Sequence, residues 1–155
     1  MTRSQAAVDP PEPADAEYGH LLAFRAEMRR FNKWSEEQAQ TLGLSHVQHQ
    51  LLLAIRGHPG PLGPTLGQAA DYLLLKPSSM TELVDRVEAG GHLLRHRAVD
   101  DGRVVRLALT PLGERELAYL TTLVLTELRR LAPVLRQVLN DAERTTAGPA
   151  NPDSA

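Results

Sequence analysis

The sequence contains no cysteine, which removes every kind of site that depends on a thiol. Disulfide frameworks, cysteine-ligated zinc or iron–sulfur clusters, thiol nucleophiles and cysteine redox sensors are all excluded. Aromatic residues make up only 4% of the 155 residues, and no apolar run is long enough to cross a bilayer. The N-terminus has no apolar stretch behind its early arginine, so we expect no secretion signal. These absences predict a cytoplasmic protein without membrane association.

The sequence also lacks a strong excess of charge and the common catalytic motifs. With 17 Lys and Arg against 19 Asp and Glu, the formal net charge is −2, so the whole-chain charge gives no reason to expect a polyanionic partner. We find no Gly-x-Ser-x-Gly, no phosphate-binding loop and no dinucleotide-binding fingerprint. We therefore predict neither enzymatic activity nor a cofactor.

The two ends of the chain differ in composition from its middle. Residues 1–16 and the last ten residues are rich in Pro, Ala and small polar residues and poor in large apolar ones. Such segments cannot bury enough apolar surface to fold, so we expect disordered tails over residues 1–16 and 146–155. A single folded domain is predicted over residues 17–145.

Apolar residues recur with helical spacing before residue 90 and again after Pro111. Two sequences of the capping-box form, beginning at Ser45 and Thr65, mark helix starts. Between residues 93 and 109 the spacing becomes that of strands around an Asp-Gly turn, which predicts a β-hairpin. Pro133 is expected to end one helix and to begin the last one. The predicted order is α-α-α-α-β-β-α-α, which is mainly helical with a small hairpin.

Two short helices joined by a tight turn, with a hairpin directly after the second, describe a winged helix-turn-helix over about residues 45–110. The second helix of such a pair can enter a DNA major groove, and a basic hairpin beside it can reach phosphates or the minor groove. Residues 92–106 hold four arginines against two aspartates, a local charge of +2 in a chain of −2. The alternative is that these arginines are only the solvated face of an ordinary hairpin.

Three segments resemble the MarR family of bacterial transcriptional regulators. DDGRVVRLALTPLGERELAYL resembles the family's wing, with Asp-x-Arg, a strand and then Leu-Thr-x-x-Gly. SSMTELVDRVEAGG resembles its recognition helix, and GLSHVQHQLLLAI resembles the helix before the helix-turn-helix. The resemblance implies a nucleoid-associated homodimer in which the first and last helices, about residues 17–42 and 111–145, interlock while the winged domains bind a pseudo-palindromic operator in double-stranded DNA.

The resemblance and the local charge place the DNA-binding candidates on the recognition helix and the hairpin, with Asp101 expected to hold the hairpin loop in place. The candidates are Lys76, Ser78, Ser79, Thr81, Glu82, Arg86, Arg95, Arg97, Asp101, Arg103 and Arg106.

The family also implies a small aromatic or phenolic ligand, bound between the dimerisation helices and the winged domain. Phe31, Trp34 and His49 lie in the parts of the sequence expected to border that cleft. A tryptophan and a histidine could stack on and orient an aromatic anion. The alternative is that Trp34 belongs to the dimer core and His49 lies on the surface.

Together these observations predict a dimeric DNA-binding regulator, a repressor that a ligand releases from its operator. The leucine-rich last helices independently favour a dimer, because surplus apolar surface needs a partner. Two alternatives remain open at this point. The first is a winged-helix protein-interaction module that does not bind DNA. The second is a metal-responsive regulator using His46 and His49, although the sequence shows no third ligand.

Overall fold

A computed structural model describes residues 12–97 and 102–146 of the chain. Most of the predicted tails, and Asp101 in the hairpin loop, lie outside these residues. Contacts divide the chain into two compact units. Unit 1 holds the chain up to Phe31 and from Glu127 onward, and unit 2 is Asn32–Thr126. The single domain expected over residues 17–145 remains a prediction.

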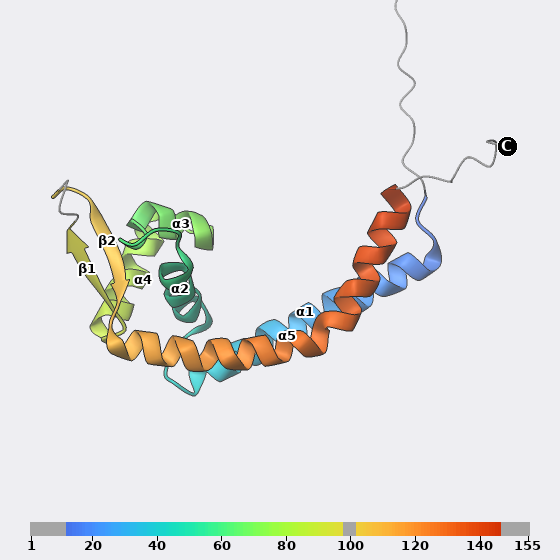
Figure 1. The fold of residues 1–155 in the computed structure, drawn as a ribbon, viewed down its shortest axis with the longest axis horizontal. Coiled ribbons are helices and arrows are strands. Elements are labelled where there is room, and N and C mark those ends of the chain that lie inside the picture. Colours follow the sequence, from blue (N-terminus) through green and yellow to red (C-terminus); the bar gives the residue numbers. More distant parts are fainter. Residues whose placement is uncertain (1–11, 98–101, 147–155) are drawn as a thin grey trace, which may run out of the picture. The chain divides into compact units, whose positions relative to one another are not determined.

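The elements follow the order α-α-α-α-β-β-α (Figure 1), which confirms the predicted fold class of a mainly helical chain with a β-hairpin. None of the described helices is long and apolar enough to span a membrane. The elements are α1 (Asp15–Gln40), α2 (His46–Gly57), α3 (Leu66–Leu73), α4 (Pro77–Ala89), β1 (Leu93–Arg97), β2 (Val105–Leu109) and α5 (Pro111–Thr146).

Unit 2 has a hydrophobic core of its own. Both predicted capping boxes are present, because the side chains of Ser45 and Thr65 each accept a hydrogen bond from the backbone N–H three residues later. These caps fix where α2 and α3 begin and so which faces of the two helices turn inward. The core joins α2, α3 and α4 to the hairpin through Leu51, Leu52, Ala69, Ala70, Met80, Leu83, Val84, Val87, Leu93 and Leu107.

The hairpin is a two-stranded antiparallel sheet in which Leu93 pairs with Leu109 and Arg97 with Val105. Leu93 and Leu107 are buried, and they hold one face of the hairpin on the core of unit 2. An isolated bridge joins Thr65 to Arg106, so the backbone just before α3 lies along the outer edge of β2.

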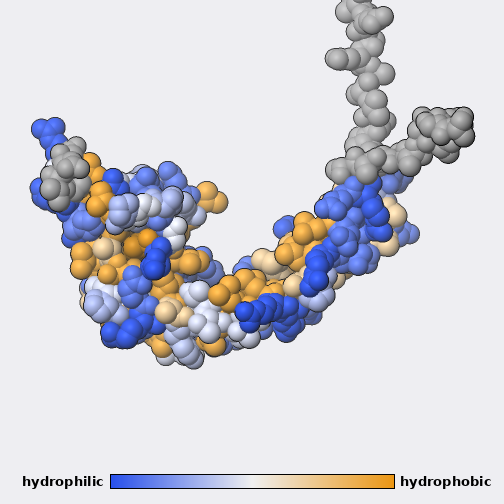
Figure 2. Space-filling view, viewed as in Figure 1, coloured by the Kyte–Doolittle hydropathy of each residue, from blue (hydrophilic) through white to orange (hydrophobic). Residues whose placement is uncertain are grey.

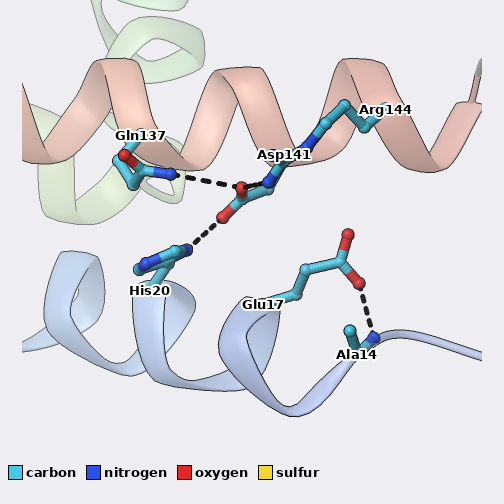
Figure 3. A network of polar contacts seen from close by, with 6 residues as sticks. All are labelled: Ala14, Glu17, His20, Gln137, Asp141 and Arg144. Atoms are coloured by element: carbon cyan, nitrogen blue, oxygen red, sulfur yellow. Dashed lines mark hydrogen bonds and ion pairs between the residues drawn. The ribbon is translucent and has the colours of Figure 1, made fainter.

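In unit 1, α1 and α5 lie side by side and are joined by a polar network (Figure 3). His20 Nδ1 lies 2.5 Å from Asp141 Oδ2, and Gln137 and Arg144 also donate to this carboxylate. Burial acts to raise the pKa of Asp141, which is only 6% exposed, but the hydrogen bond from His20 and the charges of His20 and Arg144 outweigh it and lower the pKa. The network therefore holds a carboxylate in its charged form between two helices.

The helix α1 begins at Asp15, two residues before the predicted start. Glu17 Oε2 accepts a hydrogen bond of 2.7 Å from the backbone N–H of Ala14, as Figure 3 shows. This bond satisfies one of the free N–H groups at the helix start, and Asp15 adds a second acidic side chain to the first turn. These two carboxylates account for the earlier start.

The predicted break at Pro133 is wrong, because α5 runs as one helix through this residue. Pro133 cannot donate to the carbonyl of Arg129, which is the cost of a proline inside a helix. Arg129 is exposed, so water can reach this part of the backbone. Burial of Leu131 and the partial burial of Val134 on the same helix favour continuing it across the lost bond.

Candidate nucleic-acid interface

The helix α4 has one buried face and one exposed polar face. Pro77 occupies the first turn, where its missing N–H costs nothing, and the helix ends at Gly90. Met80, Leu83 and Val84 are at most 1% exposed and hold the helix on the core of unit 2. The opposite face consists of short polar and charged side chains, all exposed: Ser78, Ser79, Thr81, Glu82, Asp85 and Arg86.

The polar face of α4 carries groups that suit the reading of base edges. Serine and threonine hydroxyls can donate and accept hydrogen bonds, and glutamate can accept from cytosine. The hydroxyl of Thr81 donates to the carbonyl of Pro77 at 3.1 Å, which leaves its oxygen lone pairs and its methyl group for contact outside the helix. Lys76, just before the first turn, is exposed as well. The structure thus brings every recognition-helix candidate to one face.

The four arginines of residues 92–106 have different surroundings in the structure. Arg97 and Arg103 are exposed near the hairpin loop, and the guanidinium of Arg97 donates to the carbonyl of Gly102 at 3.2 Å. Arg95 and Arg106 are half-buried and are held by other parts of unit 2.

Arg95 connects β1 to α4. Its guanidinium lies 2.5 Å from Asp85 and also pairs with Glu88, whose carboxylate in addition accepts the backbone N–H of Arg95 at 3.1 Å. Burial acts to lower the pKa of Arg95, but the two carboxylates outweigh it and raise the pKa. Arg95 was predicted to contact DNA, and the structure surrounds its charge with protein partners.

Arg106 holds the loop before α3. Its Nη1 donates to the carbonyl of Gly63 at 2.8 Å, and its buried Nε has no hydrogen-bond partner among the described residues. Gly63 has a φ of +73°, and a Cβ at this position would lie 2.1 Å from the carbonyl oxygen of Leu107. The loop therefore approaches β2 more closely than a residue with a side chain permits.

The structure explains why the Leu-Thr-x-x-Gly motif needs its threonine and its glycine. Thr110 caps α5 by accepting from the N–H of Gly113, and its hydroxyl donates to the carbonyl of Gly91 at 2.6 Å. Gly113 is buried, and a Cβ there would lie 2.1 Å from the carbonyl oxygen of His92. The ring of His92 also bonds Glu116 at 2.8 Å. The motif thus fastens the start of α5 to the turn between α4 and β1.

The turn between α3 and α4 carries a feature that the sequence did not reveal. Leu74 adopts the left-handed conformation, with φ 54° and ψ 38°, in a position that normally favours glycine. Its side chain is 92% exposed. The N–H of Leu75 donates to Ala70, which closes the end of α3 and directs the chain into α4. A glycine here would have identified the helix end, and its absence removed that signal.

The candidate ligand residues are divided between the two units. Phe31 belongs to unit 1, whereas Trp34 and His49 belong to unit 2. His49 is only 2% exposed, so the alternative that placed it on the surface is wrong. Burial and, to a lesser extent, the nearby His46 lower the pKa of His49, and its Nδ1 has no hydrogen-bond partner among the described residues. Phe31 and Trp34 are half-buried.

The described residues contain no group of three or more His, Asp or Glu side chains that could hold a metal ion. His46 and His49 lie one turn apart at the start of α2, and both rings place Nδ1 in buried positions.

Comparison with known proteins finds a family model that matches the central part of the chain. Residues 42–104, from the turn after α1 to the residue before β2, match the model of the MarR family. The predicted resemblance to the MarR family is confirmed. No curated protein matches the sequence.

Solved structures with the MarR fold extend the similarity beyond the matched segment. A MepR–DNA complex from S. aureus has 17% identity and a TM-score of 0.65, with 81% of this chain and 91% of that chain covered. YusO from Bacillus subtilis has 22% identity and a TM-score of 0.60, with 90% and 100% covered. The apo form of MarR from E. coli has 21% identity and a TM-score of 0.59, with 78% and 96% covered. At these identities the likeness shows the fold.

Proposed function

We propose that the chain is a DNA-binding transcription regulator, a homodimer that uses α4 and the hairpin to bind a pseudo-palindromic operator in double-stranded DNA. The observation that carries the proposal is the exposed polar face of α4, with two exposed arginines on the adjacent hairpin. Base-edge contacts need short polar side chains on a helix that fits the major groove, and positioning needs cations that reach phosphates.

The positive charges of the exposed side chains support this assignment. Arg95 and Arg106 are engaged within unit 2, so Lys76, Arg86, Arg97 and Arg103 are the cations we assign to DNA. Ser78, Ser79, Thr81 and Glu82 are assigned to base edges. Asp101 retains its proposed role of supporting the loop. Among the structures with the same fold, MepR has been captured with DNA.

The homodimer is supported by the composition of unit 1. Leu131 is the buried hydrophobic residue of its described part, whereas many large apolar side chains are exposed. Hydrophobic residues, coloured orange in Figure 2, form patches along the parts of α1 and α5 that belong to unit 1. When α1 and α5 pack against each other, each helix still exposes apolar side chains on its other sides. A second copy of the chain is the natural partner for these side chains. The exposed side chains are Tyr18, Leu21, Leu22, Leu128, Leu135 and Leu139.

The sign of regulation and the response to a ligand belong to the proposal as well. We propose a repressor that a small aromatic or phenolic ligand releases from its operator, with Phe31, Trp34 and His49 as the candidate contacts. The buried ring of His49 supports a ligand role. Its pKa is lowered, and its Nδ1 has no hydrogen-bond partner among the described residues.

The decisive experiment identifies the operator by sequencing DNA that the protein captures, then measures affinity for operator and random duplexes across a range of salt. A specific regulator binds the operator at least about 10³-fold more tightly than random DNA, with a steep fall of affinity as salt rises. Weak binding that does not distinguish the two duplexes, or binding without salt dependence, would support the protein-interaction alternative.

A further inference from the structure

Unit 2 has an open apolar groove of about 250 Å³ between the second half of α2 and the end of α3. Its wall includes Leu53 and Tyr72, which are 45% and 52% exposed although both side chains are large and apolar. Leu73 also lines the groove, and the side chain of the next residue, Leu74, is 92% exposed. These four residues together form the α2–α3 patch.

The most exposed residue of the α2–α3 patch is also held in a strained conformation. Leu74 has φ 54° and ψ 38°, a conformation that disfavours residues with a Cβ. Its N–H donates to the carbonyl of Asp71 at 3.3 Å, which fixes it at the end of α3. Because the side chain gains almost no burial within unit 2, its position favours a contact made outside the chain.

The groove beside Leu74 is already formed. The hydroxyl of Tyr72 lies 2.9 Å from Nδ1 of His58, and the two rings pack edge to face with their centroids 5.9 Å apart. These contacts hold the aromatic wall in one orientation. A partner that inserts an apolar side chain into the groove therefore loses little free energy in ordering it.

Two exposed charges of opposite sign lie on either side of Leu74 in the sequence. Asp71 comes three residues before it and Lys76 two residues after it, and neither has an ion-pair partner among the described residues. Across a two-fold axis, the acidic residue of each copy can face the basic residue of the other. The groove and the projecting leucine are complementary in the same way, so the patch matches a second copy of itself.

We propose that the α2–α3 patch is a second self-association face, which binds the same face of another copy in the DNA-free protein. Leu74 of each copy enters the groove of the other, and Asp71 of each copy pairs with Lys76 of the other. The face belongs to unit 2, whereas the homodimer proposed above uses unit 1. Lys76 is also assigned to DNA, so self-association and operator binding compete for this side chain. Since the patch is much smaller than a stable protein interface, the contact is weak and forms above micromolar concentration.

A charge exchange tests the pairing of the two copies. Sedimentation velocity of the DNA-free protein, from about 10 µM to about 1 mM, should show species larger than the unit 1 dimer at the high end. Asp71→Lys and Lys76→Asp, both at exposed positions, should each weaken this association at least about tenfold, because like charges then face each other. The double variant Asp71→Lys with Lys76→Asp should restore it.

Leucine variants test the apolar part of the contact. Leu74→Gly removes the projecting side chain and relieves the strain, so it should weaken self-association at least about tenfold without loss of stability. Leu94→Ala is the matched control, since Leu94 is 43% exposed on β1 and outside the patch, and it should associate like wild type.

The unit 1 variant Leu22→Lys with Leu139→Lys separates this face from the homodimer. It should still form dimers near 1 mM, and Asp71→Lys should weaken them. Absence of self-association, equal effects of Leu74→Gly and Leu94→Ala, or a double charge exchange that does not restore the contact would each overturn the proposal. Because no DNA is present, these outcomes are independent of the proposed regulator function.

Discussion

At the scale of single residues, the four arginines of residues 92–106 differ in their exposure and in what surrounds them. Arg95 lies between Asp85 and Glu88, so its loss would leave two carboxylates close together without their cation. Arg97 and Arg103 are exposed near the loop end of the hairpin, away from the carboxylates that hold Arg95. The sequence cannot make this division, because spacing along the chain does not show that Arg95 lies beside Asp85 and Glu88 or that Arg106 reaches the carbonyl of Gly63.

We expect Arg103→Ala to leave the melting temperature and dimerisation unchanged and to weaken operator binding by about 1–3 kcal/mol per half-site. Its guanidinium is proposed to lie in the negative potential of a narrow minor groove, so the salt dependence should become shallower by about one unit for each contact removed. Asp101→Ala should have a weaker effect of the same kind. Affinities are measured by fluorescence anisotropy at several salt concentrations.

Arg95→Ala is the control for this prediction. It should lower the melting temperature by about 2–4 °C, because two acidic side chains lose their partner. Operator binding by Arg103→Ala that equals wild type at every salt concentration would show that the wing does not touch DNA.

Ser79→Ala should change specificity without changing the fold. Ser79 is exposed on α4, opposite the buried stripe, so its hydroxyl contributes little to stability. A lost base contact costs about 1–3 kcal/mol, and the loss should fall on one or two base positions of each half-site. Binding to a panel of operator variants measures this. An equal loss on operator and random DNA would instead identify Ser79 as a phosphate contact.

At the scale of elements, the turn between α3 and α4 combines local strain with an exposed apolar side chain. Leu74 holds a left-handed conformation that costs a residue with a Cβ about 1 kcal/mol or more. Its 92% exposed side chain gains almost nothing from packing in return. The turn is therefore a place where the chain carries strain without local compensation.

Leu74→Gly should raise the free energy of unfolding by about 1 kcal/mol, because glycine accepts this conformation without the Cβ clash. Leu75→Gly is the matched control, since Leu75 is half-buried against the core and its loss should be destabilising. Thermal unfolding of both variants gives the answer. A fall in melting temperature for Leu74→Gly would mean that the leucine side chain makes a contact that matters.

Local sequence signals predicted most elements, because each carried its own short-range chemistry. The capping boxes at Ser45 and Thr65 and the strand spacing after residue 92 depend on neighbouring residues alone. Pro133 was misjudged because helix continuation there depends on packing beyond the local sequence. The burial of His49 and the ion pairs of Arg95 depend on tertiary contacts, which no spacing rule encodes.

At the scale of the whole molecule, the proposed dimer accounts for the large apolar residues that unit 1 exposes. We expect light scattering to give the mass of a dimer at micromolar concentration. Leu22 is 66% exposed and Leu139 is 51% exposed, so Leu22→Lys with Leu139→Lys should place charges in the interface and yield monomers. Leu74→Lys, also at an exposed leucine but in unit 2, should remain dimeric. A wild-type monomer would contradict the dimer.

Unit 1 should also lose stability in acid. The pKa of Asp141 is lowered in the folded chain by its bonds and charges from His20, Arg144 and Gln137, against the opposing effect of burial. A carboxylate whose pKa is lower in the folded chain than in the unfolded chain stabilises the fold at pH values above its unfolded pKa. This contribution is lost as the pH falls through the folded pKa. Asp141→Asn should therefore lower the melting temperature at neutral pH. At a pH below the ordinary pKa range of an aspartate, its melting temperature should approach that of the wild type. Parallel curves at all pH values would contradict this assignment.

The close contact between Gly113 and the carbonyl of His92 has a mechanical consequence. The first turn of α5 cannot rotate independently of the turn that ends α4, because Thr110 and Gly113 fasten the two together. The start of α5 and the turn that follows α4 therefore move together. In the proposed dimer, a reorientation of that end of α5 would be passed on to the end of α4, and so to the spacing of the two copies of α4, which has to match the spacing of the operator half-sites.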